Sequence, residues 1–342
     1  MTDAQPVRIV GGGLAGLSLG IALGRAGVPA EIFEADDYPR HRVCGEFICG
    51  LSEATMEKLG IGSAFAGAGS HRRVTWFLRD RPVRRQSLPA PARAISRFAL
   101  DARLAALFVA GGGKLKTHTR FVTPIRHAGW VDTAGRKSRG SSPWLGLKLH
   151  ARNLATADDL ELHLGDGAYV GLSAVEDGWI NVCGLFRRRP GLNVDREQAL
   201  PAYLRACGLS HLAERLARAE VRPDSRKAIA GIAVNRRIPP ATGLHLGDAC
   251  AMIPPFTGNG MAMAFIGSAL ALDPLVAWAR HDCSWIETVR GIQESLRREF
   301  RLRLGGAALL HPFLLDRSLQ RCLGAAARSG CLPLASLYRL LH

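Results

Sequence analysis

The chain opens with short apolar runs separated by glycine and polar positions. The first run covers residues 7–10 and ends at Gly11, and the second covers residues 30–33 and ends at Glu34. Between them lies a stretch rich in small and apolar residues, which suits a helix that packs closely on a sheet. Continuous apolar runs joined by a helix are typical of parallel, buried strands. The pattern therefore predicts a strand, a helix and a second strand.

Helical and strand patterns alternate along the rest of the chain. The predicted elements are a helix over 52–60, one or two strands over 72–88, a helix from 95 to 110, a strand-rich stretch over 144–186, helices over 195–220 and a strand over 226–238. Ser52 is suited to cap the first of these helices and Gly60 to end it. Hairpin turns are expected at 165–167 and 177–178. Arg97 lies at a helix start, and Asp101, one turn on, is placed to pair with it.

The first strand leads into a G-x-G-x-x-G sequence formed by Gly11, Gly13 and Gly16. In a βαβ unit, the first glycine allows a tight turn, the second lets the backbone approach a pyrophosphate, and the third lets the helix pack on the strand. Backbone N–H groups at the helix start then face the phosphates. Glu34, 18 residues after Gly16, is placed to accept hydrogen bonds from a ribose. A carboxylate there suits an unphosphorylated ribose, which favours FAD or NAD over NADP.

A second motif lies near residue 250. A strand delivers Gly247-Asp248, and a proline-glycine turn then opens a helix of small residues at about Gly258–Met261. Asp248 can accept from a polyol hydroxyl, and N–H groups at the helix start can face an electron-rich ring edge. Alone, this would be an ordinary capped helix after a strand. Together with the N-terminal motif, it is specific for a dinucleotide site.

The loop after Glu34 leaves the carboxyl end of the second strand, where open α/β sheets bind their ligands. Arg40 and Arg42 lie in this loop and are either ligands for phosphate or ribose oxygens or solvated charges. Cys44 either lines a flavin face as a catalytic residue or is a buried, inert thiol.

Charge and composition narrow the choice of partners. The 342 residues include 45 Lys and Arg against 29 Asp and Glu, a net charge of +16, and 47% are hydrophobic, as in a folded globular protein. Such a charge suits nucleic acid, an anionic membrane or acidic substrates, or is simply a basic surface. Because no run of like charges or basic–aromatic interleaving occurs, nucleic acid is not an expected partner.

The cysteines and the N-terminus indicate the compartment. Eight cysteines are scattered without a C-x-x-C pair, so neither a disulfide framework nor a zinc site is expected, and no metal is predicted. The chain enters its first strand within seven residues, without a signal peptide. We also expect no apolar run of the roughly 20 residues that span a bilayer. These features predict a cytoplasmic protein, with peripheral membrane contact as an open alternative.

The C-terminal stretch, residues 283–342, is predicted to be helical. Four arginines alternate there with leucine and phenylalanine: Arg297, Arg298, Arg301 and Arg303. This pattern suits an amphipathic helix at a membrane surface. It equally suits a helix that packs on its own domain.

These motifs, in this order, resemble the superfamily of FAD-dependent monooxygenases and geranylgeranyl reductases, which has the p-hydroxybenzoate hydroxylase fold. The resemblance covers roughly residues 5–285. It implies that Gly11–Glu34 holds the ADP half of FAD, that Arg97 lies near the middle of the cofactor, that Asp248 binds its ribityl or pyrophosphate region, and that Gly258–Met261 lies beside the isoalloxazine. The expected FAD-binding residues are Gly11, Gly13, Leu14, Ala15, Gly16, Glu34, Ala35, Arg42, Arg97, Gly247, Asp248, Gly258, Asn259, Gly260 and Met261.

The resemblance also predicts the fold class and the domains. The fold class is α/β: a Rossmann-like FAD-binding domain, an inserted strand-rich substrate domain and a helical C-terminus. The expected boundaries are 1–71, 93–143 and 241–282 for the FAD-binding domain, 72–92 and 144–240 for the substrate domain, and 283–342 for the helical segment. Two features resemble the reductase branch: Pro39 followed by Cys44-Gly45, and 257–260 followed by Ser268-Ala269. The chain departs from the family pattern in having only 20 residues between Gly113 and Ala134.

Three functions follow from this resemblance. The first is a geranylgeranyl-reductase-like flavoenzyme, in which transiently bound NAD(P)H reduces FAD and the flavin passes hydride to an apolar, lipid-like alkene. The second is a monooxygenase that uses O2 to oxygenate a phenolic or lipid substrate. The third is a degenerate, non-catalytic flavin-binding or membrane-surface protein left by the shortened 113–134 region.

Overall fold

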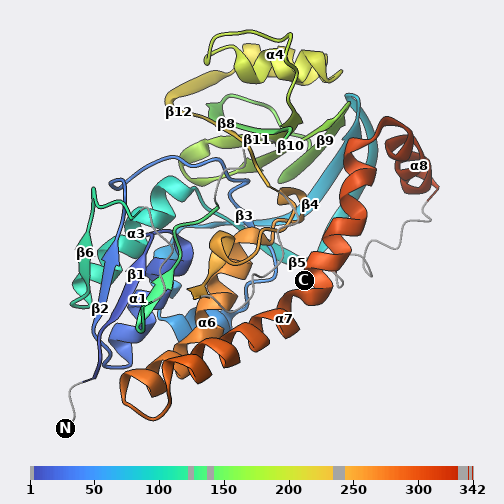
Figure 1. Cartoon of the computed structure of the whole chain (residues 1–342). Helices are drawn as coiled ribbons and strands as arrows, with labels where there is room; N and C mark the ends of the chain where they lie inside the picture. Colours follow the sequence, from blue (N-terminus) through green and yellow to red (C-terminus); the bar gives the residue numbers. More distant parts are fainter. Residues whose placement is uncertain are drawn as a thin grey trace.

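The structure, a computed structural model, describes residues 4–121, 127–136, 142–233 and 243–329, together with Tyr338 and Leu341. Its described residues form two β-sheets with helices packed on them (Figure 1). The C-terminal helices run along both parts of the molecule, and the main apolar cores lie one on the smaller sheet and two on the larger sheet.

The smaller sheet carries the predicted βαβ unit. Its strand order is β13 (Leu244–His245), β7 (Trp130–Asp132), β1 (Val7–Val10), β2 (Ala30–Phe33) and β6 (Lys114–Lys116). All four strand pairings are parallel. Helix α1 (Leu14–Arg25) joins β1 to β2 and packs against α3 (Arg97–Ala110) and α6 (Gly260–Ala279). The prediction of a parallel α/β sheet is therefore confirmed. Both described strands within 113–134 join this sheet.

The larger sheet holds the strand-rich middle of the chain. Its strand order is β12 (Glu220–Ala230), β8 (Trp144–Arg152), β11 (Ile180–Arg187), β10 (Ala168–Ala174), β9 (Leu160–Gly165), β4 (Gly69–Leu78), β5 (Arg81–Ala94) and β3 (Phe47–Ile48). Helices α4 (Ala199–Ala206) and α5 (Ser210–Ala217) cover one face, where Leu149 and Leu172 pack against Leu204 and Leu212. The predicted turns after β9 and before β11 are present.

One strand prediction needs adjustment in this region. The strand predicted over 226–238 already begins at Glu220, and residues 234–242 lie outside the described part of the chain. Residues 72–88 contribute to two strands, β4 and β5, in agreement with the prediction of one or two. Strand β3, in a segment predicted to belong to the FAD-binding domain, pairs with β5 of the larger sheet. The division into domains itself stays a prediction.

The predicted helix signals at residues 52–60 are borne out. Helix α2 (Glu53–Leu59) begins after Ser52, whose hydroxyl accepts a hydrogen bond from Thr55 N. Gly60 ends the helix in the left-handed region, with φ of 71°. This is the common glycine ending, because glycine adopts positive φ without a Cβ clash.

Helix α6 corrects the expectation that no apolar run reaches membrane-spanning length. It is 20 residues long with a mean hydropathy of 1.6, so by length and composition it would span a bilayer. However, 61% of its apolar stretch is buried, and it packs against α1, α2 and α7. Its apolar character is accounted for by its place in the core.

The C-terminal segment forms α7 (Trp285–Leu315) and α8 (Arg317–Arg328). Phe300 and Leu314 of α7 are buried, whereas Leu302 and Leu309 are 62% and 69% exposed. The alternative of a helix packed on its own protein is therefore correct for one face of α7. Its other face leaves apolar and basic side chains exposed, so a membrane contact stays a prediction.

Candidate functional site

Gly11 and Gly16 of the motif lie where a Cβ would clash with the backbone. Gly11 has φ of +104°, and a Cβ there would lie 2.5 Å from the Thr133 carbonyl oxygen. At Gly16 a Cβ would lie 2.1 Å from the Gly11 carbonyl oxygen. The Thr133 hydroxyl donates to that carbonyl at 2.6 Å, which joins β7 to the turn. These contacts match the roles that the motif predicted for Gly11 and Gly16.

Gly13 differs from these two because open space surrounds it. A Cβ there would meet only Arg97 Nη2, at 3.9 Å. The N-cap residue of α1 is Gly13, which has no side chain to cap the helix, and the first turn carries no acidic residue. The N–H groups of the first turn, which include Leu14 and Ala15, are therefore available to an anion. An open cradle beside unused donors fits the pyrophosphate of FAD.

Glu34 lies next to this turn, but protein groups already contact its carboxylate. Oε2 accepts from Gly12 N at 2.7 Å and pairs with Arg40 Nη2 at 2.9 Å, while Oε1 accepts from Asp36 N at 3.0 Å. Burial alone would raise the pKa of Glu34, but the hydrogen bond and charge of Arg40 lower it. A carboxylate offers about four acceptor positions, so a ribose hydroxyl can still share it. Sequence reasoning did not foresee the Arg40 pair.

Arg97 brings the two predicted motifs together. It pairs bidentately with Asp101, with N–O distances of 2.7 and 2.8 Å, as the helical spacing predicted. Burial would lower the pKa of Arg97, but the charge of Asp101 and, less strongly, that of Asp248 raise it. A Cβ at Gly247 would lie 3.2 Å from Ala15 Cβ, so Gly247-Asp248 lies against the start of α1. The predicted residues Arg97, Asp248 and Gly13 thus converge.

Two other predicted residues lie on the rim of this area. Arg42 lies between Glu34 and Asp101, at 3.9 and 3.7 Å from their carboxylates. Ala35 follows Glu34 and is partly exposed. Both lie where the ADP half of FAD is expected, although neither contacts another predicted group closely.

The second motif packs against the loop that contains Cys44. Cys49 N donates to the Gly258 carbonyl at 3.2 Å, and a Cβ at Gly258 would lie 2.3 Å from the Phe47 ring. Asn259 is buried and its amide donates to the Leu341 carbonyl. Its Oδ1 is buried without a partner among the described residues, while the Cα of Gly260 borders open space. Met261, just inside α6, is buried.

Cys44 itself is held in a fixed loop. Asn181 of β11 donates to the carbonyl oxygens of Cys44 and Gly45, at 3.0 and 2.8 Å. Burial raises the pKa of the Cys44 thiol, although the charge of Arg97 opposes this. The thiol is therefore protonated at neutral pH and suits a proton donor better than a nucleophile.

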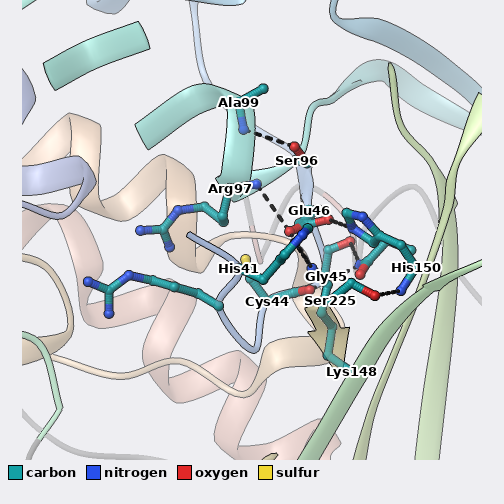
Figure 2. Close-up of polar contacts among 12 residues, drawn as sticks. His41, Cys44, Gly45, Glu46, Ser96, Arg97, Ala99, Lys148, His150 and Ser225 are labelled. Atoms are coloured by element: carbon teal, nitrogen blue, oxygen red, sulfur yellow. Dashed lines mark hydrogen bonds and ion pairs between the residues drawn. The ribbon is translucent and has the colours of Figure 1, made fainter. Parts of the chain in front are cut away.

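A buried polar cluster behind this loop was missed by sequence reasoning (Figure 2). Glu46 accepts from Lys148 Nζ at 3.0 Å, from His150 Nε2 at 2.6 Å and from Arg97 N at 3.1 Å. The side chains of Glu46 and Lys148 are both fully buried. Figure 2 shows the Arg97 side chain extending away from Glu46, to which only its backbone N–H is bonded. Glu46 therefore ties the Cys44 loop and the start of α3 to β8.

Electrostatics keep the charges of this cluster in place. Burial alone would raise the pKa of Glu46, but the charge of Lys148 and the hydrogen bond from His150 lower it to about 2. His41, 3.3 Å from Lys148 Nζ through its Nδ1, has its pKa lowered to about 3 by burial and by the charge of Lys148. At neutral pH His41 is neutral and Glu46 is ionised.

One sequence signal indicates that β8 has a buried acidic partner, although it does not identify Glu46. In β8, Lys148 and His150 alternate with Leu147, Leu149 and Ala151. Side chains alternate between the two faces of a strand, so the apolar face packs on α4 and α5 and the polar face meets the Cys44 loop. Lysine and histidine on the inner face of an otherwise apolar strand indicate a buried acidic partner.

An apolar cavity of about 170 Å3 lies beside the start of α6. Phe47, Phe256 and Thr257 form its wall at that end, and side chains of α7 and α8 line the rest together with β4, β5, β9 and β10. The described groups that border it are mostly apolar, such as Trp76, Leu162 and Leu314. A cavity of roughly 150 Å3 can hold benzene, so this one admits a ring or a segment of an alkyl chain.

Comparison with known proteins places the fold. No protein-family model matches the chain. A menaquinone reductase of Mycolicibacterium smegmatis is 29% identical over 140 residues, which is 40% of this chain and 33% of that protein. The chain thus spans about a third of the length of this curated relative.

Solved structures match most of the chain. HpxO of Klebsiella pneumoniae, solved with FAD and uric acid, has a TM-score of 0.76 at 16% identity and covers 98% of this chain and 96% of its own. PqsL of P. aeruginosa, in complex with 2-aminobenzoylacetate, has a TM-score of 0.70 at 17% identity. The match covers 92% of this chain and 98% of PqsL. The flavin-dependent brominase Bmp2 has a TM-score of 0.73 at 17% identity. The match covers 98% of this chain and 92% of Bmp2.

The chain therefore has the predicted fold, that of FAD-dependent monooxygenases of the p-hydroxybenzoate hydroxylase type. These likenesses support the predictions of FAD and of an oxidoreductase. They do not distinguish the geranylgeranyl reductase branch from the rest of the superfamily.

Proposed function

We propose that this chain is an FAD-dependent oxidoreductase that reduces an apolar, lipid-like substrate, with NAD(P)H as a transient reductant. The observation that carries the proposal is the apolar cavity, whose wall at Phe256 and Thr257 leads directly into the start of α6. By family resemblance, the isoalloxazine lies at that helix start. The local likeness to a menaquinone reductase supports a reductive reaction.

The chain's own groups would hold FAD along one path. The N–H groups at the start of α1 and the Arg97 guanidinium would meet the pyrophosphate, Glu34 and Arg42 the ADP ribose, and Asp248 the ribityl region. Gly258–Met261 would lie beside the ring system. When bound, reduced FAD supplies the hydride for substrate reduction; the protein orients it and excludes water.

Proton delivery is the step that the protein itself would perform. The Cys44 thiol is protonated at neutral pH because burial raises its pKa. Asn181 fixes the loop that carries it, and Glu46 fixes the next turn to β8. Cys44 would donate a proton from Sγ to the substrate after hydride arrives, with solvent as the alternative donor.

A second candidate is a monooxygenase that acts on a phenolic or lipid substrate. The observation that favours it is the fold likeness to HpxO and PqsL, which were solved with small aromatic molecules. The cavity also admits a single ring. Both candidates would bind FAD through the same residues. They differ in the electron acceptor, which is the substrate in a reductase and O2 in a monooxygenase.

Turnover with and without O2 tests the choice. Purified protein would be given NADH or NADPH and a lipid quinone or polyprenyl lipid, in air and in an anaerobic chamber, with products identified by mass spectrometry. A reductase forms a product two hydrogens heavier in both atmospheres. A product that gains oxygen, and that appears only in air, would replace the first candidate by the second. A protein that stays colourless after incubation with FAD would point to the non-catalytic, membrane-surface alternative.

A further inference from the structure

A second hollow, of about 440 Å3, lies at the end of the apolar cavity distant from α6. Five arginines surround it: Arg79, Arg81, Arg317, Arg321 and Arg328. We call it the arginine hollow. Leu78 and Val83 belong to the walls of both hollows, so the two adjoin. Figure 1 shows α8 beside the β4–β5 hairpin, which together supply all five arginines.

The two acidic residues next to these arginines in sequence are directed elsewhere. Asp80 accepts from His211 N at 2.8 Å and from Leu212 N at 3.3 Å, at the start of α5. Asp316 accepts from Ser318 N and Leu319 N and so caps α8. Their carboxylates therefore bind backbone N–H groups at the starts of α5 and α8 and do not neutralise the arginines. The arginine hollow thus keeps a strong positive charge.

The sequence of α8 assigns its faces to the two hollows. Gln320, Leu323, Gly324 and Ala327, at helical spacings of three and four, line the apolar cavity. Arg317, Arg321 and Arg328 lie along the neighbouring edge and line the arginine hollow. One helix thus joins an apolar wall to a cationic one.

We propose that the two hollows together bind an amphiphile with a phosphate-type anionic headgroup. The headgroup lies among the arginines, whose planar guanidinium groups suit phosphate oxygens. The apolar chain lies in the cavity and points toward Phe256 and Thr257. This assignment rests on the proposed function in so far as the cavity receives the substrate, and it means that the apolar end, not the headgroup, meets the flavin.

Binding of a defined probe tests the proposal without turnover. Dodecyl phosphate and dodecyl maltoside share a chain and differ in charge, and each would be titrated below its critical micelle concentration by calorimetry. We expect the flavin-loaded protein to bind dodecyl phosphate more tightly, with an affinity that falls as salt rises.

Two variants separate the headgroup from the chain. Arg317→Gln/Arg321→Gln/Arg328→Gln should weaken dodecyl phosphate by about tenfold and leave dodecyl maltoside unchanged. Gly171→Leu extends a side chain from a position on the cavity wall where a Cβ has its nearest neighbour at 3.9 Å, and it should weaken both probes. The matched control, Arg290→Gln/Arg298→Gln/Arg301→Gln on α7, removes the same charge from exposed positions that line neither hollow.

The proposal is overturned if the α8 triple variant binds dodecyl phosphate like its parent, or if Gly171→Leu does so. It is also overturned if the triple variant loses binding only to phosphatidylglycerol vesicles, since the arginines would then face a membrane surface. Flavin content is measured on every sample. Protein that binds dodecyl phosphate but never retains FAD would overturn the proposed function and leave the amphiphile site standing.

Discussion

The two sheets bring side chains to the candidate site by different routes. On the smaller sheet, Gly11, Gly13, Gly16 and Glu34 all belong to one βαβ unit. On the larger sheet, the cavity is closed by elements far apart in the chain, from Phe47 to α8. A cofactor site made within one unit depends on single residues, so we expect abrupt losses there. Because many residues line the cavity, a single substitution there should weaken substrate binding only in part.

The sharpest test of this comparison is Gly13→Val. A Cβ at Gly13 meets no protein atom closer than Arg97 Nη2, at 3.9 Å, so we expect folding to be unaffected, but the valine side chain fills the space that a pyrophosphate needs. We expect complete loss of bound FAD, measured by absorbance after denaturation, with an unchanged melting temperature. Gly191→Val is the matched control, because it also points into open space but lies at an exposed turn away from the site. A yellow Gly13→Val protein would show that the cofactor lies elsewhere.

The junction of the two sheets should be the next most sensitive place. Glu46→Gln leaves the buried Lys148 without its counter-charge, and breaking such a pair costs about 3–5 kcal/mol. We expect that loss in the free energy of unfolding, measured in urea. Glu46→Gln/Lys148→Met removes both charges and should recover most of it. Equal stability of the single variant and its parent would mean that the cluster does not join the sheets.

Asp248→Ala should have a smaller effect on the cofactor side. One charge-assisted hydrogen bond is worth roughly 1.5–3 kcal/mol, or about a ten- to hundredfold change in affinity. We expect weaker FAD binding, measured by titrating the apoprotein, without unfolding. Asp248→Asn keeps the shape and should retain part of the affinity. If the alanine variant binds FAD as tightly as the parent, Asp248 does not contact the cofactor.

The smallest predicted effect concerns Cys44→Ser. Serine keeps a donor of similar size, so the flavin spectrum should be unchanged. Because solvent can also supply the proton, turnover should fall by less than the roughly hundredfold that a dedicated general acid contributes. The ratio of kcat values in parallel assays measures this. Full activity would leave Cys44 with a packing role only.

Sequence reasoning worked best where function depends on neighbours in the chain. The turn at Gly11–Gly16, the α2 caps and the Arg97–Asp101 pair all follow from local spacing, and the structure contains each of them. The Glu46–Lys148–His150 cluster joins residues about a hundred positions apart, so no local pattern predicts the pairing. The cavity was missed for the same reason, because its walls come from the larger sheet, from the turn before α6 and from α7 and α8.

The tight contact between α8 and the β4–β5 hairpin has a consequence for synthesis. A Cβ at Gly324 would lie 2.9 Å from Leu78, so the last described helix packs directly on a strand made some 250 residues earlier. While a ribosome makes the chain, the βαβ unit can form early, but the apolar faces of β4, β9 and β10 stay bare until α7 and α8 emerge. We expect chains that end before α8 to bind chaperones or aggregate, because exposed apolar surface associates with other chains.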